Sequence, residues 1–177
     1  KKSALETVLT VLHAGGKFDG NNYKTAGGLH GVGASVVNAL SKELTAVVRR
    51  DGAQYRISFA KGKATSKLQK LKGAVRGSGT TITFTPDPTI FPKTDFDSAT
   101  ILGRLETASF LHRGLKITYI DEVAKKKETF LHEDGIVDYL KKVLKDRKAN
   151  PIHEVPFSLR RDDEARMELT LQWTDST

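Results

Sequence analysis

A glycine-rich run directly precedes an apolar helix pattern near the start of the chain. Four of the seven residues at 27–33 are glycine, and apolar residues then recur at helical spacing over 34–40. Glycine lets the backbone turn tightly and take positive φ. The free amides of the helix's first turn, and its positive dipole end, would point back at the loop, an arrangement that binds anions. The run therefore predicts a phosphate-binding loop.

The two commonest phosphate loops do not fit this run. No lysine followed by serine or threonine comes directly after the glycines, and no β-rich run precedes them. The pattern therefore matches neither a Walker A loop nor a dinucleotide fingerprint. His30, inside the run, could also be a metal ligand or a general base. However, no second histidine or carboxylate stands at ligand spacing from it, and HExxH is absent.

Two longer runs surround these glycines, LHAGGKF and then YKTAGGLHGVGASVVNALS. Together they resemble the ATP lid of the B subunits of bacterial type IIA topoisomerases, meaning DNA gyrase and topoisomerase IV. These subunits belong to the wider GHKL group of ATPases, with Hsp90, histidine kinases and MutL. The downstream runs TITFTPD and TIFPKTDF are also similar to the topoisomerase subunits. The resemblance implies a Bergerat-type α/β sandwich with an ATP site.

Site residues follow from the resemblance position by position. Lys17 matches a lysine on the phosphate side, and Tyr23 matches a tyrosine near the adenine. Thr80 matches the strand threonine that helps to hold the adenine and its bound water, and Arg50 matches an arginine that aminocoumarin inhibitors contact. The residues implied to line the triphosphate are Gly28, Leu29, His30, Gly31, Val32, Gly33 and Ala34.

Other parts of such an ATP site are expected outside this sequence. The resemblance implies that the catalytic glutamate and the asparagine that binds Mg²⁺ lie upstream, so we assign no catalytic residue and no metal ligand here. We expect residues 1–177 to be a piece of the ATPase domain, with its ATP lid at 15–34 and with the N-terminal part and the transducer domain absent. Such a piece alone should hydrolyse ATP negligibly.

The resemblance also implies a function for the parent protein. ATP binding would close the lid and dimerise two ATPase domains, and the resulting clamp would capture DNA for strand passage with the A-type cleavage subunit. Two alternatives stay open: a nucleic-acid-binding or interaction module that keeps the lid without turnover, and another GHKL ATPase. The sequence does not separate gyrase from topoisomerase IV.

The composition of the chain limits the classes of protein to which it can belong. The chain has 177 residues, no cysteine and a formal net charge of +8. No apolar run is long enough to span a membrane, and the N-terminus lacks the apolar core of a signal peptide, which is compatible with a cytoplasmic protein. The charge suits a polyanionic partner. Because no aromatic residues are interleaved with the lysines, we interpret them as solvated faces rather than a dedicated DNA groove.

The remaining patterns predict an α+β fold with a mixed, mainly antiparallel sheet and helices on one face. Ser3 and Glu6 have capping-box spacing before a helix that should run to Gly15. Beyond the helix over 34–40, Asp97 should cap another helix, and a further helix should follow Gly135. Strands are expected at 44–50, 55–59, 63–71 and 80–84, then in a hairpin with its tip at 125–127 and in a final hairpin over 156–173 that turns at Asp162 and Asp163.

Overall fold

The structure is a computed structural model that describes residues 2–14, 31–161 and 167–175. The chain divides into two compact units, Lys1–Asp95 and Phe96–Thr177. All paired strands run antiparallel, and helices accompany them in both units. The predicted α+β class is therefore confirmed, although the described strands form three separate sheets. No described helix has both the length and the apolar character needed to cross a membrane.

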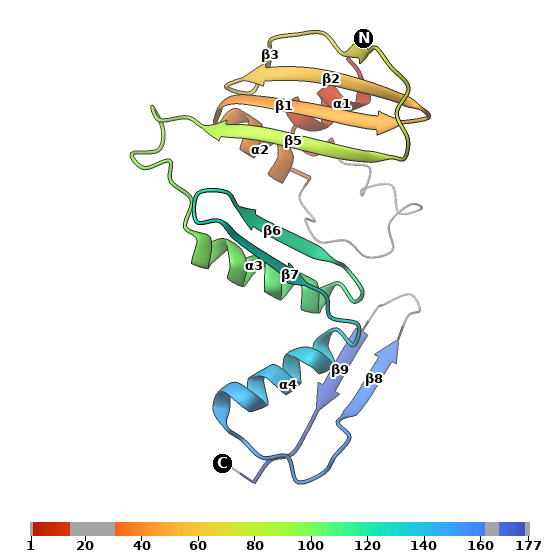
Figure 1. The fold of residues 1–177 in the computed structure, drawn as a ribbon, viewed down its shortest axis with the longest axis vertical. Helices are drawn as coiled ribbons and strands as arrows, with labels where there is room; N and C mark the ends of the chain where they lie inside the picture. Colours follow the sequence, from red (N-terminus) through yellow and green to blue (C-terminus); the bar gives the residue numbers. More distant parts are fainter. Residues whose placement is uncertain (1, 15–30, 162–166, 176–177) are drawn as a thin grey trace. The chain divides into compact units, whose positions relative to one another are not determined.

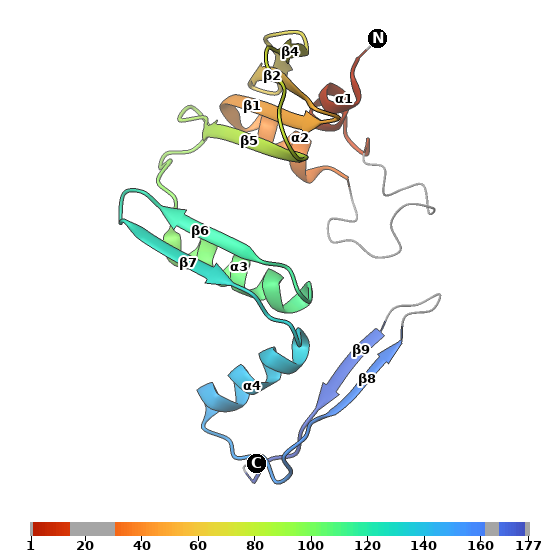
Figure 2. The same ribbon diagram turned by 45° about the vertical axis from the view of Figure 1, so that its right-hand side comes forward.

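The first unit is a sheet with two short helices on one face (Figures 1 and 2). Neighbouring strands follow the order β3-β2-β1-β5, and β4 also pairs with β2. The elements are α1 (Ala4–Thr10), α2 (Gly33–Ala39), β1 (Ser41–Arg50), β2 (Ala53–Ala60), β3 (Lys63–Ala64), β4 (Gln69–Leu71) and β5 (Gly79–Pro86).

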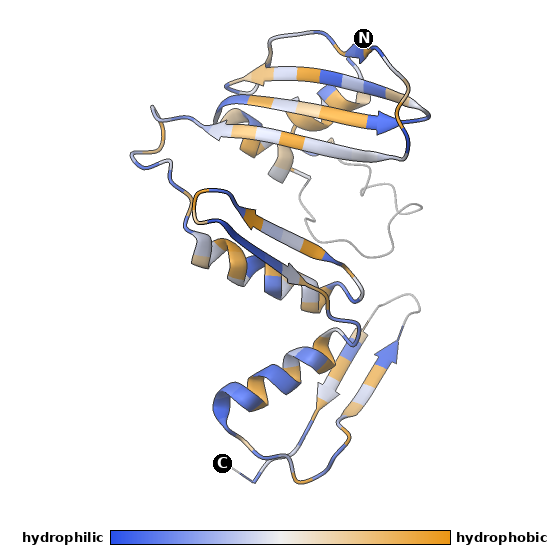
Figure 3. Ribbon diagram, in the orientation of Figure 1, coloured by the Kyte–Doolittle hydropathy of each residue, from blue (hydrophilic) through white to orange (hydrophobic). Residues whose placement is uncertain are grey.

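Alternation along the strands divides this sheet into an inner face, toward the helices, and an outer face (Figure 3). On the inner face, Leu44 of β1 stands opposite both Phe59 of β2 and Phe84 of β5. The buried core, to which α1 contributes a single leucine, is made by Leu9, Leu44, Ala46, Ile57 and Phe59. The turn predicted at Asp51 and Gly52 is confirmed, since both residues take positive φ between β1 and β2.

A buried carboxylate fixes the end of β5. Asp87 is 1% exposed, and its Oδ1 accepts hydrogen bonds from the amide of Thr89 at 2.9 Å and from its hydroxyl at 2.8 Å. Its Oδ2 lies 3.0 Å from Lys61 Nζ, and its own amide donates to the carbonyl of Leu40. The contacts with the carboxylate, first of all the hydrogen bond from the Thr89 amide and then those from Lys61 and the Thr89 hydroxyl, lower the pKa of Asp87 from 3.8 to about 2.

The second unit contains two helices and two hairpins. Asp97 caps α3 as predicted, because its side chain accepts a hydrogen bond from the amide of Ala99. Ser98, at the start of α3, donates to the carboxylate of Asp121 in the first hairpin. The elements are α3 (Ser98–Leu111), β6 (Ile117–Asp121), β7 (Lys126–Phe130), α4 (Ile136–Arg147), β8 (Phe157–Arg161) and β9 (Met167–Leu171).

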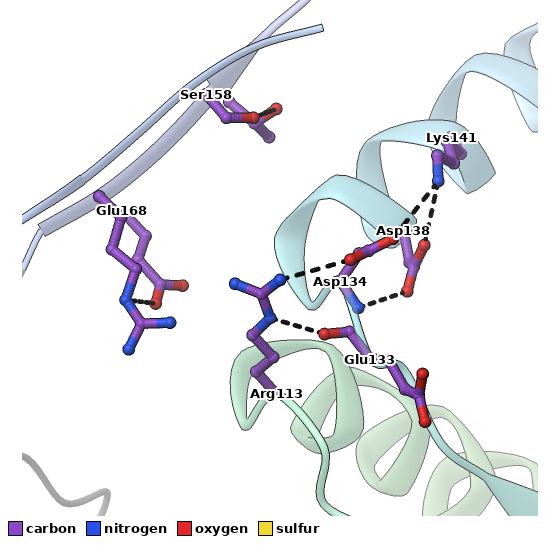
Figure 4. Close-up of polar contacts among 9 residues, drawn as sticks. Arg113, Glu133, Asp134, Asp138, Lys141, Ser158 and Glu168 are labelled. Atoms are coloured by element: carbon purple, nitrogen blue, oxygen red, sulfur yellow. Dashed lines mark hydrogen bonds and ion pairs between the residues drawn. The ribbon is translucent and has the colours of Figure 1, made fainter. Parts of the chain in front are cut away.

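A polar cluster joins α3 to the start of α4 (Figure 4). Arg113 donates from Nε to the carbonyl of Glu133 at 2.6 Å, and its Nη2 lies 3.3 Å from Asp134 Oδ1. The amide of Asp134 in turn donates to the carboxylate of Asp138, which also pairs with Lys141. Between the two helices, Phe110 is buried and stacks on His132 with ring centroids 3.7 Å apart.

Three predicted elements differ from the structure. The first helix ends at Thr10 rather than near Gly15, because the chain becomes extended at Val11. The segment 63–71 forms the short strands β3 and β4 instead of one strand. Lys126 and Lys127 lie within β7, so the tip of that hairpin comes earlier than predicted. The turn predicted at Asp162 and Asp163 lies outside the described residues.

Gly135, directly before α4, has a backbone that only glycine adopts easily. Its φ is +57° with ψ −118°, and an added Cβ would lie 3.2 Å from the carbonyl oxygen of Phe110. We expect Gly135→Ala to lower the free energy of unfolding by about 1–3 kcal/mol, because of backbone strain and this contact. Urea unfolding followed by the fluorescence of Trp173, the one tryptophan, measures the change in this unit.

Gly103 provides the matched control for that change. It lies inside α3, and an added Cβ would meet no atom within 4 Å. Gly103→Ala should therefore stabilise the unit by roughly 0.5–1 kcal/mol through higher helix propensity. Equal effects of the two substitutions would contradict the strain assigned to Gly135.

Asp87 should make the first unit acid-sensitive. The folded-state pKa of Asp87 lies below its ordinary value. The stabilisation that its ionised carboxylate gives to the fold is therefore complete above pH 3.8 and is lost as the pH falls toward about 2. Asp87→Asn should be less stable near neutral pH and should show a flatter pH dependence across this interval. Urea unfolding followed by circular dichroism measures both effects. Asp51→Asn is the control, because that side chain is 89% exposed; if it flattens the profile equally, Asp87 is not the cause.

Candidate functional site

A cavity of about 680 Å³ opens on the inner face of the first sheet. Its walls come from both helices and from two neighbouring strands. The lining residues are Ala4, Leu5, Val8 and Leu9 of α1, Gly33, Ala34 and Val37 of α2, Leu44 and Val48 of β1, and Thr80 and Ile82 of β5.

One helix supplies an apolar wall because its start is fixed. The Ser3 hydroxyl accepts a hydrogen bond from the amide of Glu6 at 3.2 Å, which confirms the predicted N-cap. With the first turn set, Leu5, Val8 and Leu9 recur at spacings of three and four residues and share one side of α1. Leu9 is buried in the core, whereas Val8 is 41% exposed at the cavity. The helix therefore offers a dry surface to a bound molecule.

A buried asparagine holds the two helical walls together. Asn38 of α2 is fully buried, and its Nδ2 donates to the main-chain carbonyl of Leu9 at 2.9 Å. This carbonyl belongs to the last turn of α1, where no further helical amide follows to bind it. The side chain of Asn38 thus replaces the missing donor. It also sets the separation of α1 and α2, and so the width of the cavity between them.

The cavity has one polar side chain in its lining. Among the described lining residues, only Thr80 carries a side-chain hydrogen-bonding group. Cross-strand register places Thr80 opposite Val48 and places Ile82 opposite Ala46, so both β5 residues share the inner face as predicted. Thr81, between them, stands on the outer face opposite Val47. A planar apolar molecule that offers a hydrogen-bonding edge to Thr80 would match this lining.

The described part of the glycine-rich run leads directly into this cavity. Gly31 takes φ +61°, which agrees with the expected positive φ, and Val32 precedes the first residue of α2. Gly33 and Ala34 then line the cavity. The structure therefore brings three of the predicted site residues, Gly33, Ala34 and Thr80, to one place. The others that fall at 15–30 lie outside the described residues: Lys17, Tyr23, Gly28, Leu29 and His30.

Arg50 lies near the cavity without lining it. It is on the same face of β1 as Val48, two residues further along, and its side chain is 78% exposed. Its guanidinium Nε is 3.4 Å from Asp51 Oδ2, a surface ion pair of small energy. The side chain is therefore available at the rim of the site.

Sequence reasoning did not assign the apolar walls to a site. Leu5, Val8 and Leu9 were recognisable as one helix face, and Ile82 as the neighbour of Thr80 on one strand face, but such patterns usually indicate core. Val37 and Val48 had no distinguishing signal. Among the described residues there is also no group of three or more His, Cys, Asp or Glu side chains able to hold a metal ion.

Comparison with known proteins places this geometry in a family. No family model matches the chain. The DNA gyrase B subunit of Thermotoga maritima is 44% identical over 183 residues, which cover 99% of this chain and 28% of that protein. The DNA topoisomerase 4 B subunit of Mycoplasma pneumoniae is 44% identical over 178 residues, with the same two coverages. The chain thus spans little more than a quarter of these relatives.

A solved structure agrees with the sequence comparison. The 43K ATPase domain of Thermus thermophilus gyrase B, in complex with an aminocoumarin, superposes with a TM-score of 0.80 and 34% identity. The match covers 98% of this chain and 43% of that one. The expected Bergerat-type fold is therefore confirmed. The chain belongs to the family of DNA gyrase and topoisomerase IV B subunits and corresponds to part of their ATPase domain.

Proposed function

We propose that the cavity of the first unit binds the adenine ring of ATP, as part of the ATPase site of a type IIA topoisomerase B subunit. The observation that supports this most directly is the lining, which is apolar except for Thr80. Adenine is flat and apolar on its faces and has hydrogen-bonding groups only on its edges. The solved relative was crystallised with an aminocoumarin, and we propose that the same cavity admits such inhibitors.

Different residues of the chain would contact different parts of the ATP molecule. Val8 and Ile82 would pack against the ring, and the Thr80 hydroxyl would hydrogen-bond to its edge directly or through water. The amides at the start of α2, around Gly33 and Ala34, would face the phosphates together with the glycine-rich run before them. Lys17 and Tyr23 would complete the phosphate and adenine contacts, as the resemblance implies.

Magnesium does not fit the residues described here. Mg²⁺ prefers oxygen ligands, usually one or two carboxylates together with substrate phosphates. Among the described residues that line the cavity, none carries a carboxylate. We therefore assign the ion no residue of this chain and derive no step through it, and we expect its ligand and the general base in another part of the parent protein.

In the parent protein, this ATP site would serve the passage of DNA. ATP binding and hydrolysis would be coupled to dimerisation of two B subunits, to closure of a clamp and to passage of DNA with the A-type cleavage subunit, in the cytoplasm. The protein would act as gyrase or as topoisomerase IV, and relatives of both names match the chain. In this scheme the part described here senses whether nucleotide is bound.

Substitution of Thr80 tests the site. Thr80→Val keeps the shape of the side chain but removes its hydroxyl, so the affinity for a non-hydrolysable ATP analogue should fall about 5- to 30-fold, as expected for one lost hydrogen bond of about 1–2 kcal/mol. Calorimetric titration of the chain measures this change. The control is Thr81→Val, whose side chain lies on the outer face. Equal loss in both variants, or no loss in Thr80→Val, would contradict the assignment.

Substitution of Arg50 tests the binding of the inhibitor separately from the binding of nucleotide. If its guanidinium meets an aminocoumarin at the rim, Arg50→Ala should weaken that inhibitor about tenfold or more, as for a charge-assisted hydrogen bond of about 1.5–3 kcal/mol, and should leave the ATP analogue unaffected. Arg49→Ala is the matched control, because the neighbouring residue points to the opposite face of β1. The same titrations give both affinities. A parallel loss for both ligands would indicate damage to the cavity instead.

A further inference from the structure

The two hairpin turns at the ends of β2 have similar backbones but different surroundings. Asp51 and Gly52 connect β1 to β2, and Lys61 and Gly62 connect β2 to β3. All four residues take positive φ, as in two-residue hairpin turns of type I′. A Cβ added at Gly52 would meet no atom within 4 Å, whereas one added at Gly62 would lie 3.1 Å from Cα of Ala39. The second turn therefore packs against the last residue of α2.

Two contacts of Lys61 keep this turn against α2. The amide of Lys61 donates to the carbonyl of Ser41 at 2.9 Å, and its ammonium lies 3.0 Å from Oδ2 of Asp87. The amide of Asp87 in turn donates to the carbonyl of Leu40 at 3.0 Å. These contacts form a closed ring around the junction between α2 and β1. The turn cannot move away from the helix without breaking one of them.

Burial strengthens this ring and connects it to the cavity wall. Ser41 and Asp87 are each 1% exposed. A buried carboxylate that loses its partner is costly, so the ion pair with Lys61 resists opening. The hydroxyl of Ser41 donates to the carbonyl of Val37 at 2.6 Å, and Val37 lines the cavity. The ring thus contacts a residue of the cavity wall through one hydrogen bond.

The helix α2 transmits the position of its last turn to the rest of the wall. Seven residues at about 1.5 Å each make it about 10 Å long. It contributes Gly33, Ala34 and Val37 to the cavity, while Ala39 lies at its opposite end. Its neighbour Asn38 carries the hydrogen bond to α1. A displacement of Ala39 therefore moves one wall of the cavity relative to the other.

We propose that Lys61, Gly62 and Asp87, which we call the α2 anchor, are positioning residues for the ATP site. They fix the C-terminal end of α2 and thereby set the affinity of the cavity for nucleotide. None of the three is among the described residues that line the cavity, so they act through the helix. This inference rests on the proposed function, because it takes nucleotide to be the ligand.

The first test compares Gly62→Ala with Gly52→Ala. Their φ values are +78° and +72°, so both substitutions strain the backbone to a similar degree. Only Gly62→Ala also forces Ala39 to shift by a few tenths of an ångström. Because binding sites tolerate only small displacements, we expect Gly62→Ala to bind a non-hydrolysable ATP analogue about three- to tenfold more weakly than Gly52→Ala. Calorimetric titration measures this ratio, and equal affinities would overturn the proposal.

The second test leaves the glycines in place. Lys61→Gln opens the ring and leaves Asp87 without its counter-charge. Lys63→Gln, on an exposed side chain of the same hairpin, removes the same charge and so reduces the long-range attraction for phosphate equally. We expect Lys61→Gln to bind the analogue at least about threefold more weakly than Lys63→Gln. Equal weakening would show that charge alone is responsible and would contradict a positioning role.

The third test needs no ligand. Two-dimensional ¹H–¹⁵N spectra of the ligand-free 177-residue chain report the surroundings of each amide. Gly62→Ala should shift the signals of Gly33 and Ala34, at the far end of α2, and Gly52→Ala should leave them in place. A general loss of stability would not produce this difference, and urea unfolding of both variants measures that loss separately. Unchanged signals in Gly62→Ala would show that the α2 anchor does not position the helix.

The combined results separate this inference from the proposed function. If the wild-type chain does not bind the analogue, the proposed function fails, and the spectra still decide whether the α2 anchor positions the helix. If the wild-type chain binds the analogue and Gly62→Ala binds it as tightly as Gly52→Ala, the proposed function stands and only the role of the α2 anchor is wrong.

Discussion

The placement of the two helices of the first unit depends on a hydrogen bond between a side chain and the backbone, from Asn38 to the carbonyl of Leu9. The two helices are each only seven residues long, too short to be stable by themselves. Their stability therefore depends on contacts with the sheet and with each other. Because Asn38 is fully buried, loss of its bond would leave a main-chain carbonyl without a partner in an apolar setting, which costs about 1–3 kcal/mol. The bond therefore links the stability of this unit to the shape of its cavity.

The sheet of this unit has two faces of different composition. The inner face combines leucine, isoleucine and phenylalanine with a single threonine at the cavity, whereas the outer face combines hydroxyls with arginine and lysine. Residues adjacent in sequence, such as Arg49 and Arg50, thus belong to different surfaces. Asp87 stabilises the end of the strand that both surfaces share, because its carboxylate contacts the turn after β5 and Lys61 beyond β2.

Much of this architecture follows from local rules in the sequence. The cap at Asp97, the turn at Asp51 and Gly52, and the alternation around Ile82 each depend on residues close together in the chain, so the predictions were right. The end of α1 was harder to place, because apolar residues continue at helical spacing to Leu12, while the backbone becomes extended at Val11.

The cavity and its support depend on contacts between distant residues. Asn38 is a polar residue within a helix and suggests a solvent-facing position. Its partner is a main-chain carbonyl 29 residues earlier, which has no sequence signature. The phosphate loop could be proposed from glycines alone, whereas the walls formed by Val8, Val37 and Val48 look like ordinary core until the strands and helices are assembled.

The alternation along β5 also constrains how this segment can change during evolution. Thr80 and Ile82 face the cavity, and Thr81 and Thr83 face outward. Point substitutions at either set alter one surface and leave the other intact, so the two surfaces can diverge independently. A single-residue insertion or deletion within the strand would exchange the two sets at once, because side chains alternate with a period of two. Homologous sequences should therefore vary in composition at 79–86 while conserving the length of this segment.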